Sequence, residues 1–443
     1  MAGPGIGGLS GGTAATPPAR LVALIAASLV MVLATILVVG YAGSVGIGGS
    51  AVSAERIVLS SGGVPIGVVG SFGEPAGPGD AVDPFQSSAD GDRVVSAVFA
   101  DLSEFWTAAL SAAGRPGLVP PTGGFVSMDS SGSADAAGST GSGALCITDP
   151  NQIAGNAFYC PNHDGIVFDS AALVPVLLGS YGSAGLAAAF AHEFGHAVQV
   201  RAGPTPAERL AEPDRYPAIL IEAQADCAAG AFLAHAAGGG STRVHIPAAS
   251  LVRAVAPLLD FRDQPAMSPT DAAAHGLGLD RLGFVLRGFR DGGMSCWAMT
   301  TDDLALTLGR AGTQAGTPTA PRFDSAAAAV EAASASVAVF AGAPASAPDP
   351  ADVDRSTAIG QFAAGAAVAL ATGRAQSGTD SGAACFTGAW TASVFGSAPV
   401  GELGSRAGDA DEALDLIRSR PGVGFDELAA YSDGFRGGRS VCD

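Results

Sequence analysis

The sequence predicts a mainly α-helical protein of the α+β class with a small β-hairpin or sheet. Apolar residues recur at helical spacing from Val94 to Trp106, and alanine-rich segments at 184–200 and 219–235 favour two further helices. Two short apolar runs at 158–160 and 166–168 flank a turn sequence and predict a hairpin. The 443 residues are enough for a large core and for two domains.

The charge balance argues against a nucleic-acid partner. Only 14% of the residues are charged, and the net charge is -19. Such a chain repels phosphate backbones, and no basic stripe interrupts its acidic character. We therefore expect no nucleic-acid binding.

The first 43 residues predict a membrane anchor. Residues 1–20 are rich in Gly, Pro and Ala and are expected to form a cytoplasmic tail. Residues 21–43 carry no charge and, as a helix, span roughly 34 Å, enough for a bilayer core. The alternative is a cleaved signal peptide, with AVSA at 51–54 as the cleavage site. The length of the apolar stretch favours a retained single-pass anchor in the cell membrane, with the body extracytoplasmic.

Six cysteines indicate the same compartment. They are even in number, widely scattered and outside any CxxC pair, which fits three disulfides in an oxidising environment better than zinc thiolates. Six buried free thiols are the alternative. The disulfide interpretation agrees with an exported body.

The segments between the anchor and the predicted helices differ in composition. Residues 44–91 contain GIGGS, PAGPGD and SSADGD and are expected to form a flexible stalk, with order beginning near Asp92. The Gly/Ser-rich residues 128–144 predict a surface loop. Four prolines in residues 202–217 predict an irregular connection between the two alanine-rich helices.

The C-terminal third contains an internal repeat. The segments 276–296 and 422–442 are equal in length and identical at nine of 21 positions, including the final cysteine. Upstream, CAAGAF at 227–232 resembles CFTGAW at 385–390. The alternative is chance similarity in a chain rich in alanine and glycine. Because the cysteines stand in the same order in both copies, we infer the disulfides Cys227–Cys296, Cys385–Cys442 and, by remainder, Cys146–Cys160.

A weaker match extends the repeat upstream. FAAGAAVALATG at 362–373 overlays FAHEFGHAVQVR at 190–201 and places Ala364, Gly365 and Val368 opposite His192, Glu193 and His196. We therefore expect residues 301–443 to form a helical C-terminal extension, a degenerate and metal-free duplicate of the preceding half.

The motif HEFGH at 192–196 has the spacing of a metal site. Histidines four residues apart share one face of a helix, so His192 and His196 can bind one ion. Glu193 points about 100° away around the helix, where it can take a proton from water activated by the metal. Gly195 costs about 0.5–1 kcal/mol relative to alanine, which predicts a packing or access role. An ordinary helix face with two histidines is the alternative.

The next predicted helix supplies a third ligand. In IEAQADC, Glu222 and Asp226 are four residues apart and share a face. Glu222 would complete a His2Glu site, and Asp226 would accept a hydrogen bond from the distal nitrogen of a ligand histidine. Two solvated surface acids are the alternative, but the flanking residues are apolar and an unpartnered buried charge is strongly disfavoured.

These blocks together resemble the bacterial neutral zinc metallopeptidase family, which is gluzincin-like. AHEFGHAVQ and ExQADC are the specific blocks, supported by FYCPNHDGIVFD and HGLGLDR, and the resemblance covers about residues 92–296. It implies a zincin-like metallopeptidase domain at 92–300. It also implies a Zn²⁺ held by His192, His196 and Glu222, Glu193 as general base, and a peptide or protein substrate.

The remaining polar residues offer a donor for the oxyanion of a tetrahedral intermediate. His275, in the HGLG block, is the preferred catalytic candidate, followed by His163 in the hairpin turn. Tyr159 and Tyr181 are further alternatives. His235 and His245 are expected to be structural.

The sequence therefore predicts a membrane-anchored, extracytoplasmic zinc metallopeptidase. One rival is a catalytically inactive envelope scaffold that keeps zinc for structure, for which a fourth protein ligand would be needed. The other is a hydrolase of non-peptide amides such as cell-wall crosslinks, which the motif does not exclude.

Overall fold

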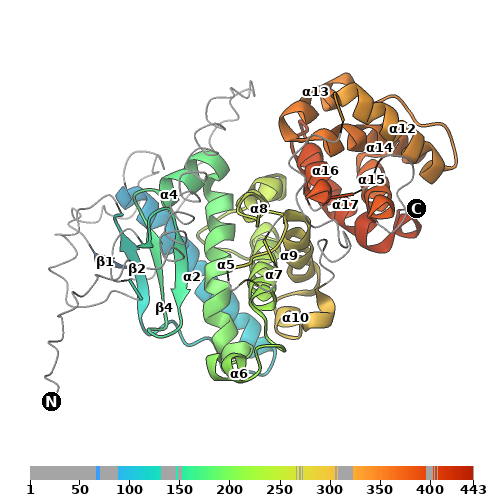
Figure 1. The fold of residues 1–443 in the computed structure, drawn as a ribbon. Helices are drawn as coiled ribbons and strands as arrows, with labels where there is room; N and C mark the ends of the chain where they lie inside the picture. The colour runs from blue at the N-terminus through green and yellow to red at the C-terminus, as the bar shows by residue number, and fades with distance from the viewer. Residues whose placement is uncertain are drawn as a thin grey trace, which may run out of the picture. The chain divides into compact units, whose positions relative to one another are not determined.

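The computed structural model describes residues 66–69, 88–130, 146–147, 152–265, 267–268, 271, 273–304, 307, 323–395, 403, 405–406 and 408–442. The predicted tail, the predicted membrane span at 21–43 and most of the predicted stalk lie outside these residues. Over the described ranges the protein is mainly helical, as predicted, with a small sheet (Figure 1).

The helices of the part up to residue 303 are, in chain order, α2 (Ser88–Ala112), α4 (Leu173–Val176), the π-helix η2 (Leu177–Tyr181), α5 (Gly182–Ala202), α6 (Pro206–Ala211), α7 (Ala218–Ala237), η3 (Ala248–Ser250), α8 (Leu251–Asp260), α9 (Gly278–Asp291), α10 (Met294–Trp297) and η4 (Thr301–Asp303). Those that follow are α12 (Ala326–Ala341), α13 (Pro350–Ile359), α14 (Gln361–Ser377), α15 (Asp380–Val394), α16 (Asp409–Arg418), α17 (Phe425–Gly437) and η6 (Arg439–Val441). Helices α5 and α7 confirm the two alanine-rich helices that the sequence predicts.

The sheet has the strand order β1-β2-β4-β3. Strand β4 (Gly165–Asp169) is antiparallel to β3 (Ala157–Cys160) and parallel to β2 (Gly124–Met128). The β3–β4 pair confirms the predicted hairpin. Its turn ends at Asp164, whose φ of 49° lies in the left-handed region that Asp tolerates better than most residues. Strand β1 (Ile66–Val69) pairs parallel with β2 and falls within the predicted stalk, so a short run rich in β-branched residues forms a strand there.

The two faces of the sheet bury different residues because side chains alternate along a strand. Ile166 and Phe168 of β4 belong to the main core, which they share with α2 and α5, whereas Val167 belongs to a small separate cluster. Phe99 of α2 stacks on Phe125 of β2 with ring centroids 4.1 Å apart. The large core therefore ties the helix that carries HEFGH to the sheet.

Gly195 has a packing role. A Cβ at this position would lie 3.0 Å from the Cβ of Ala228 and 3.2 Å from the Cα of Ala225, both on α7. Real Cβ atoms rarely approach this closely, so glycine lets α5 and α7 come together at the level of the motif. This close approach brings residues from the two helices to one site.

All three predicted disulfides are confirmed. Cys146 pairs with Cys160, Cys227 with Cys296, and Cys385 with Cys442. The last two have the same Cα–Cα distance of 5.5 Å and join equivalent elements, because each links the first helix of a packed pair to the segment after the second helix. These pairs are α7 with α9 and α15 with α17.

The two helix pairs also cross in the same way. A Cβ on Gly230 would collide with the carbonyl oxygen of Val285, and a Cβ on Gly388 would collide with that of Tyr431. In the opposite direction, Gly288 lies against the carbonyl of Cys227 and Gly434 against that of Cys385. Sequence identity, disulfide and helix crossing thus repeat together, which supports the internal repeat.

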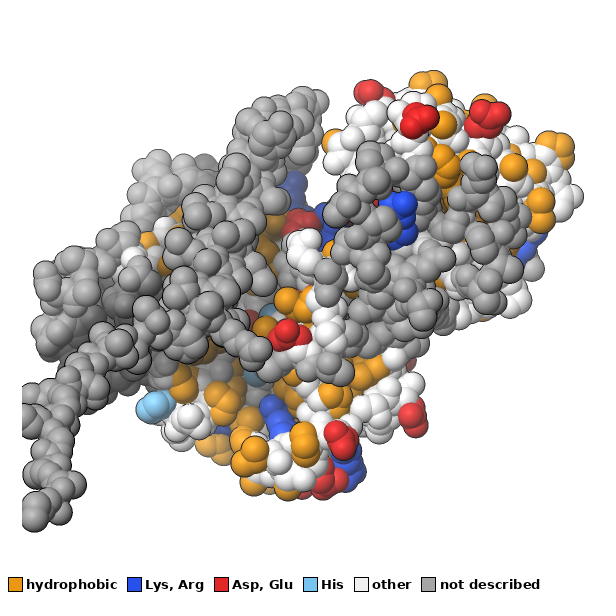
Figure 2. Space-filling model, in the orientation of Figure 1, with side chains coloured by type: hydrophobic (Ala, Val, Ile, Leu, Met, Phe, Trp, Pro, Cys, Tyr) orange, Lys and Arg blue, Asp and Glu red, His pale blue; other side chains and the backbone are white. Residues whose placement is uncertain are grey.

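Two helices within the described residues are long and apolar enough to cross a membrane by length and composition alone. They are Gly91–Ala112 and the continuous stretch Leu173–Ala202, and each buries 56% of its most apolar window within the protein. Core helices of soluble proteins have the same properties, so this is weak evidence for membrane association. On the face drawn in Figure 2, arginine and acidic side chains lie scattered among apolar ones, without a continuous basic patch among the described residues.

Candidate metal centre

The two histidines of the motif lie side by side on α5. Their ring centroids are 4.9 Å apart and their planes are nearly perpendicular, at 88°. His192 is 4% exposed, and His196 is partly buried. The spacing of four residues therefore places both imidazoles on one helix face, as the sequence predicts.

Glu222 of α7 faces both imidazoles. Its Oε2 lies 3.2 Å from His192 Nε2, and its Oε1 lies 3.6 Å from His196 Nε2. Ligand atoms of the three residues all lie within 4.8 Å of one another. The sequence separates Glu222 from the motif by a connection with four prolines, and the close α5–α7 contact brings it back.

The hydrogen bonds around the histidines orient their Nε2 atoms towards Glu222. Asp226 Oδ1 lies 2.8 Å from His192 Nδ1, and Gln199 Oε1 lies 3.4 Å from His196 Nδ1. Because both partners are acceptors, each Nδ1 would carry the proton once the ring is neutral, as a metal ligand must be, which leaves the Nε2 lone pair free to bind an ion. Two Nε2 atoms and a carboxylate face one point, an arrangement that can hold a cation.

The spacing of these atoms fits a metal ion. Ligands about 2.0–2.2 Å from a tetrahedral ion lie roughly 3.3–3.6 Å apart, close to the two nitrogen–oxygen distances above. Glu222 Oε2 is also a buried oxygen without a hydrogen-bond partner in the part of the chain that the structure describes. Two imidazoles and one carboxylate suit zinc among the divalent metals.

The electrostatics of the cluster favour positive charge. Burial opposes the imidazolium form of His192, but Asp226 and Glu222 outweigh it and raise the pKa of His192 to about 10. Burial likewise opposes ionisation of Glu222, yet the nearby His196 and His192 hold its pKa well below the usual value. A divalent cation at this point would supply positive charge of the kind that these carboxylates stabilise.

Asp226 is held by an arginine that the sequence analysis did not single out. Arg281 of α9 donates from Nε to Asp226 Oδ2 and from Nη2 to Oδ1, each at 2.8 Å. Both side chains are buried, and Asp226 is fully inaccessible. Burial opposes ionisation of Asp226, but Arg281 and His192 hold its pKa below the usual value. The carboxylate therefore stays charged and fixes the ring of His192.

The neighbouring glutamines complete this support. Gln199 of α5 donates from Nε2 to the carbonyl of Ile221 and to Gln224 Oε1, so its own Oε1 remains available to His196. Gln199 is fully inaccessible and Gln224 is 1% exposed. Gln199 stands in the quoted block AHEFGHAVQ and Gln224 in ExQADC, which is the signal that could have identified them.

Glu193, the predicted general base, is partly buried on α5. It precedes the fully buried Phe194 and lies one residue from His192, so it borders the cluster without belonging to the group of ligand atoms. Its negative charge also contributes to the raised pKa of His192.

His275 lies beside the cluster. Its Nε2 is 3.7 Å from Glu222 Oε2, and its Nδ1 is 3.8 Å from Asp263 Oδ1. Asp263 Oδ2 also accepts the backbone N–H groups of His275 and Gly276, which shapes the loop. The hydrogen bond with Asp263 raises the pKa of His275 against the effect of burial. The side chain is 45% exposed, so it reaches both the cluster and solvent.

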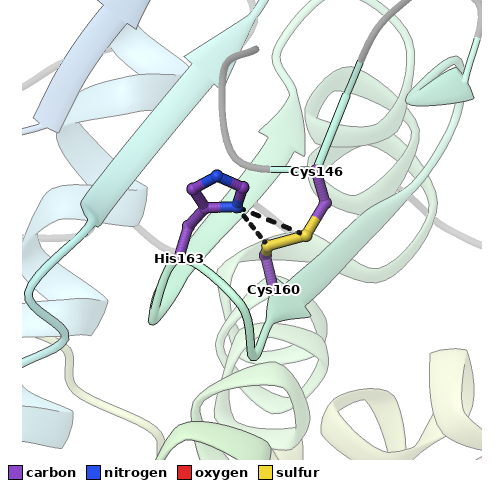
Figure 3. A group of neighbouring side chains, drawn as sticks. All are labelled: Cys146, Cys160 and His163. Carbon is purple, nitrogen blue, oxygen red and sulfur yellow. Dashed lines mark hydrogen bonds between the residues drawn. A yellow bond between two sulfur atoms is a disulfide. The ribbon is translucent and has the colours of Figure 1, made fainter.

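The other donor candidates have different partners. His163 lies against the Cys146–Cys160 disulfide, with Nδ1 3.2 Å from Cys160 Sγ (Figure 3). Tyr159 donates to Asp164, and Tyr181 packs against Phe261. The ring of His235 packs at a tilt against Phe105, with centroids 4.8 Å apart, in keeping with its predicted structural role. Cys146, Cys160 and His163 form a second group with metal-ligand atoms, but their thiolates are consumed by the disulfide.

The C-terminal copy has different chemistry at the equivalent place. Counting back from Cys385 as from Cys227, Asp380 stands where Glu222 stands in the first copy. Asp380 pairs with Arg374 and lies 4.0 Å from Arg420 Nη1. Ala364 and Val368 are buried at the positions of the two histidines. In this copy the carboxylate at the position of Glu222 therefore pairs with arginines, and apolar side chains stand at the positions of the two histidines.

Comparison of the chain with protein-family models, with curated proteins and with solved structures finds no match.

Proposed function

We propose that this protein is a zinc-dependent metallopeptidase, anchored in the cell membrane with its body extracytoplasmic. The observation that carries the proposal is the convergence of His192, His196 and Glu222, with both Nε2 atoms directed at one carboxylate. The resemblance to the neutral zinc metallopeptidase family, and the zincin-like architecture it implies, agree with a helix pair beside a small sheet with an antiparallel edge strand.

Each residue near the cluster has a role in peptide hydrolysis. His192, His196 and Glu222 would hold the ion, which when bound polarises a carbonyl and makes nearby water more acidic. Glu193 takes a proton from the attacking water and delivers it to the leaving amine. His275, oriented by Asp263, donates a hydrogen bond to the developing oxyanion. Asp226 and Gln199 keep the two ligand imidazoles in their orientation.

The proposal is tested by the variant Glu193→Gln in the full, oxidised chain. We expect the parent to cleave an unfolded protein and the variant to cleave it about 10²–10⁴-fold more slowly, because the amide does not accept the proton. Both proteins should retain one zinc ion, measured by elemental analysis. The exposed Glu331→Gln on α12 is the matched control and should cleave like the parent.

Equal cleavage by the parent and Glu193→Gln would contradict this mechanism. Zinc bound by both proteins with cleavage by neither, across unfolded proteins and peptides, would contradict the peptidase assignment. Cleavage of cell-wall crosslinks but of no peptide would favour the non-peptide amidase.

A second candidate is a zinc-binding scaffold without catalysis. The observation that favours it is the position of His275, whose Nε2 lies 3.7 Å from Glu222 Oε2, within reach of becoming a fourth ligand. The variant His275→Ala separates the two functions. A peptidase keeps its zinc affinity and loses turnover, whereas a closed structural site loses zinc affinity.

A further inference from the structure

Two segments that support the candidate metal centre meet at the start of α9. The helix begins at Gly278 and carries Arg281, which holds Asp226. The preceding segment, 261–277, carries Asp263 and His275. Arg281 Nη1 also donates to the carbonyl of Phe261, so the helix and the segment are joined.

A carboxylate from the C-terminal copy binds this junction. Asp411 of α16 accepts the N–H of Gly278 at Oδ2 and the N–H of Leu279 at Oδ1, each at 2.8 Å. These are among the first N–H groups of α9, which have no partner within the helix, and a negative charge at this end is favoured. Asp411 is 3% exposed, so the contact is shielded from water.

The same carboxylate also restrains the segment that bears His275. Arg262 Nε lies 3.3 Å from Asp411 Oδ2, and its Nη2 donates to Asp415 Oδ2 at 2.8 Å. Arg262 is the neighbour of Asp263, the residue that orients His275. Arg418, also on α16, pairs with Asp260 at the end of α8. Helix α16 therefore contacts both ends of the segment 261–277, near Asp260 and Arg262 at one end and at Gly278 at the other.

The fit at the junction is close. A Cβ on Gly278 would lie 3.3 Å from Asp411 Oδ1 and 3.1 Å from Arg262 Cδ. Glycine at the first position of α9 thus allows the carboxylate to reach two backbone N–H groups at once. A side chain at 278 would push Asp411 or Arg262 away.

We propose that Asp411 is a positioning residue for the metal centre, and that the C-terminal copy serves as a clamp on the first copy rather than as a second catalytic unit. Asp411 fixes the start of α9, Arg281 on that helix fixes Asp226, and Asp226 fixes His192. Through Arg262, the same carboxylate sets the position of Asp263 and His275. The expected effect on turnover rests on the proposed function. The expected effect on metal binding can be measured without catalysis.

The test compares two variants of the full chain that both lie in the C-terminal copy. Asp411→Asn keeps the shape but removes the charge and one acceptor. Ser336→Ala removes the hydroxyl that accepts the buried Trp390 Nε1–H at 3.1 Å, away from the α9 junction, and serves as the control for general destabilisation. We measure zinc affinity by chelator competition and record the visible spectrum of the cobalt-loaded protein. Both measurements are made at a temperature below the unfolding transitions of the two variants. Turnover is measured alongside.

We expect Asp411→Asn to bind zinc about tenfold or more weakly, with an altered cobalt spectrum and a lower kcat, because supports of metal ligands have effects of this size. Ser336→Ala should match the parent in zinc affinity, cobalt spectrum and kcat. The proposal is overturned if the two variants have the same metal affinity and spectrum. If Asp411→Asn does not fold, Arg262→Gln carries the test with the same expectation. If the parent binds zinc but cleaves nothing, the proposed function is contradicted. The zinc affinities and cobalt spectra of Asp411→Asn and Ser336→Ala then still decide whether the clamp exists.

Discussion

At the scale of single residues, the candidate site depends on the protonation state and orientation of two imidazoles. The sequence predicts His192, His196, Glu222 and Asp226 because helical spacing places each pair on one face. Arg281 ends the quoted block HGLGLDR, but the sequence does not pair it with Asp226, because 55 residues separate them and no helical spacing connects them. Distances across a fold are set by packing, which a single sequence does not display.

The role of Asp226 leads to a prediction on metal affinity. We expect Asp226→Asn to weaken zinc binding about 10–100-fold, because the amide no longer holds the Nδ1–H of His192 with a full charge and leaves Arg281 without its ion pair. Chelator competition measures the change. Asp352→Asn is the matched control, because Asp352 is a buried aspartate of the C-terminal copy that pairs with Arg355 and Arg420. Equal losses in the two variants would contradict the assigned role.

At the scale of elements, helices and hairpin follow from local patterns, whereas the rest of the sheet does not. Strand β2 has only five residues and begins at the second glycine of a Gly-Gly pair, so its sequence indicates a turn as much as a strand. It pairs in parallel with β1 and β4, and parallel partners are distant in sequence. The disulfides were predictable because the repeat places cysteines in the same order twice. Gly230, Gly288, Gly388 and Gly434 mark the helix crossings only once the structure is known.

Helix α9 also carries a titratable group that predicts a pH effect on stability. Burial raises the pKa of Asp280 from 3.8 to about 7, although Thr307 donates hydrogen bonds to it. Between about pH 4 and pH 7 the folded chain therefore binds more protons than the unfolded chain. The contribution of Asp280 to the free energy of unfolding thus falls as the pH rises through this window and is constant above it.

The variant Asp280→Asn should lack this fall in the free energy of unfolding with rising pH. In the presence of a chelator, we expect the parent to lose more stability between pH 4.5 and pH 7.5 than the variant does, as measured by urea unfolding. Asp426, exposed at the equivalent position of α17, offers the control Asp426→Asn, which should keep the slope of the parent. A parallel change in parent and Asp280→Asn would show that the buried carboxyl does not titrate in this range.

At the scale of the whole molecule, the two copies share helix crossings and disulfides but differ in chemistry. The first copy gathers two imidazoles and a carboxylate, whereas in the second copy the matching carboxylate, Asp380, pairs with two arginines. The cluster of the first copy is largely buried, whereas Arg374 and Asp380 of the second copy are exposed. A single metal ion per chain, bound by the first copy, is the expectation that follows.

The most direct test of this account is X-ray absorption at the zinc edge of the zinc-loaded full chain, together with Glu222→Ala. The account predicts one zinc per chain with two imidazole nitrogens and two oxygen ligands at about 2.0–2.2 Å, and loss of an oxygen ligand or of the metal in the variant. Sulfur ligands, a third imidazole in the shell, or an unchanged spectrum in Glu222→Ala would contradict it.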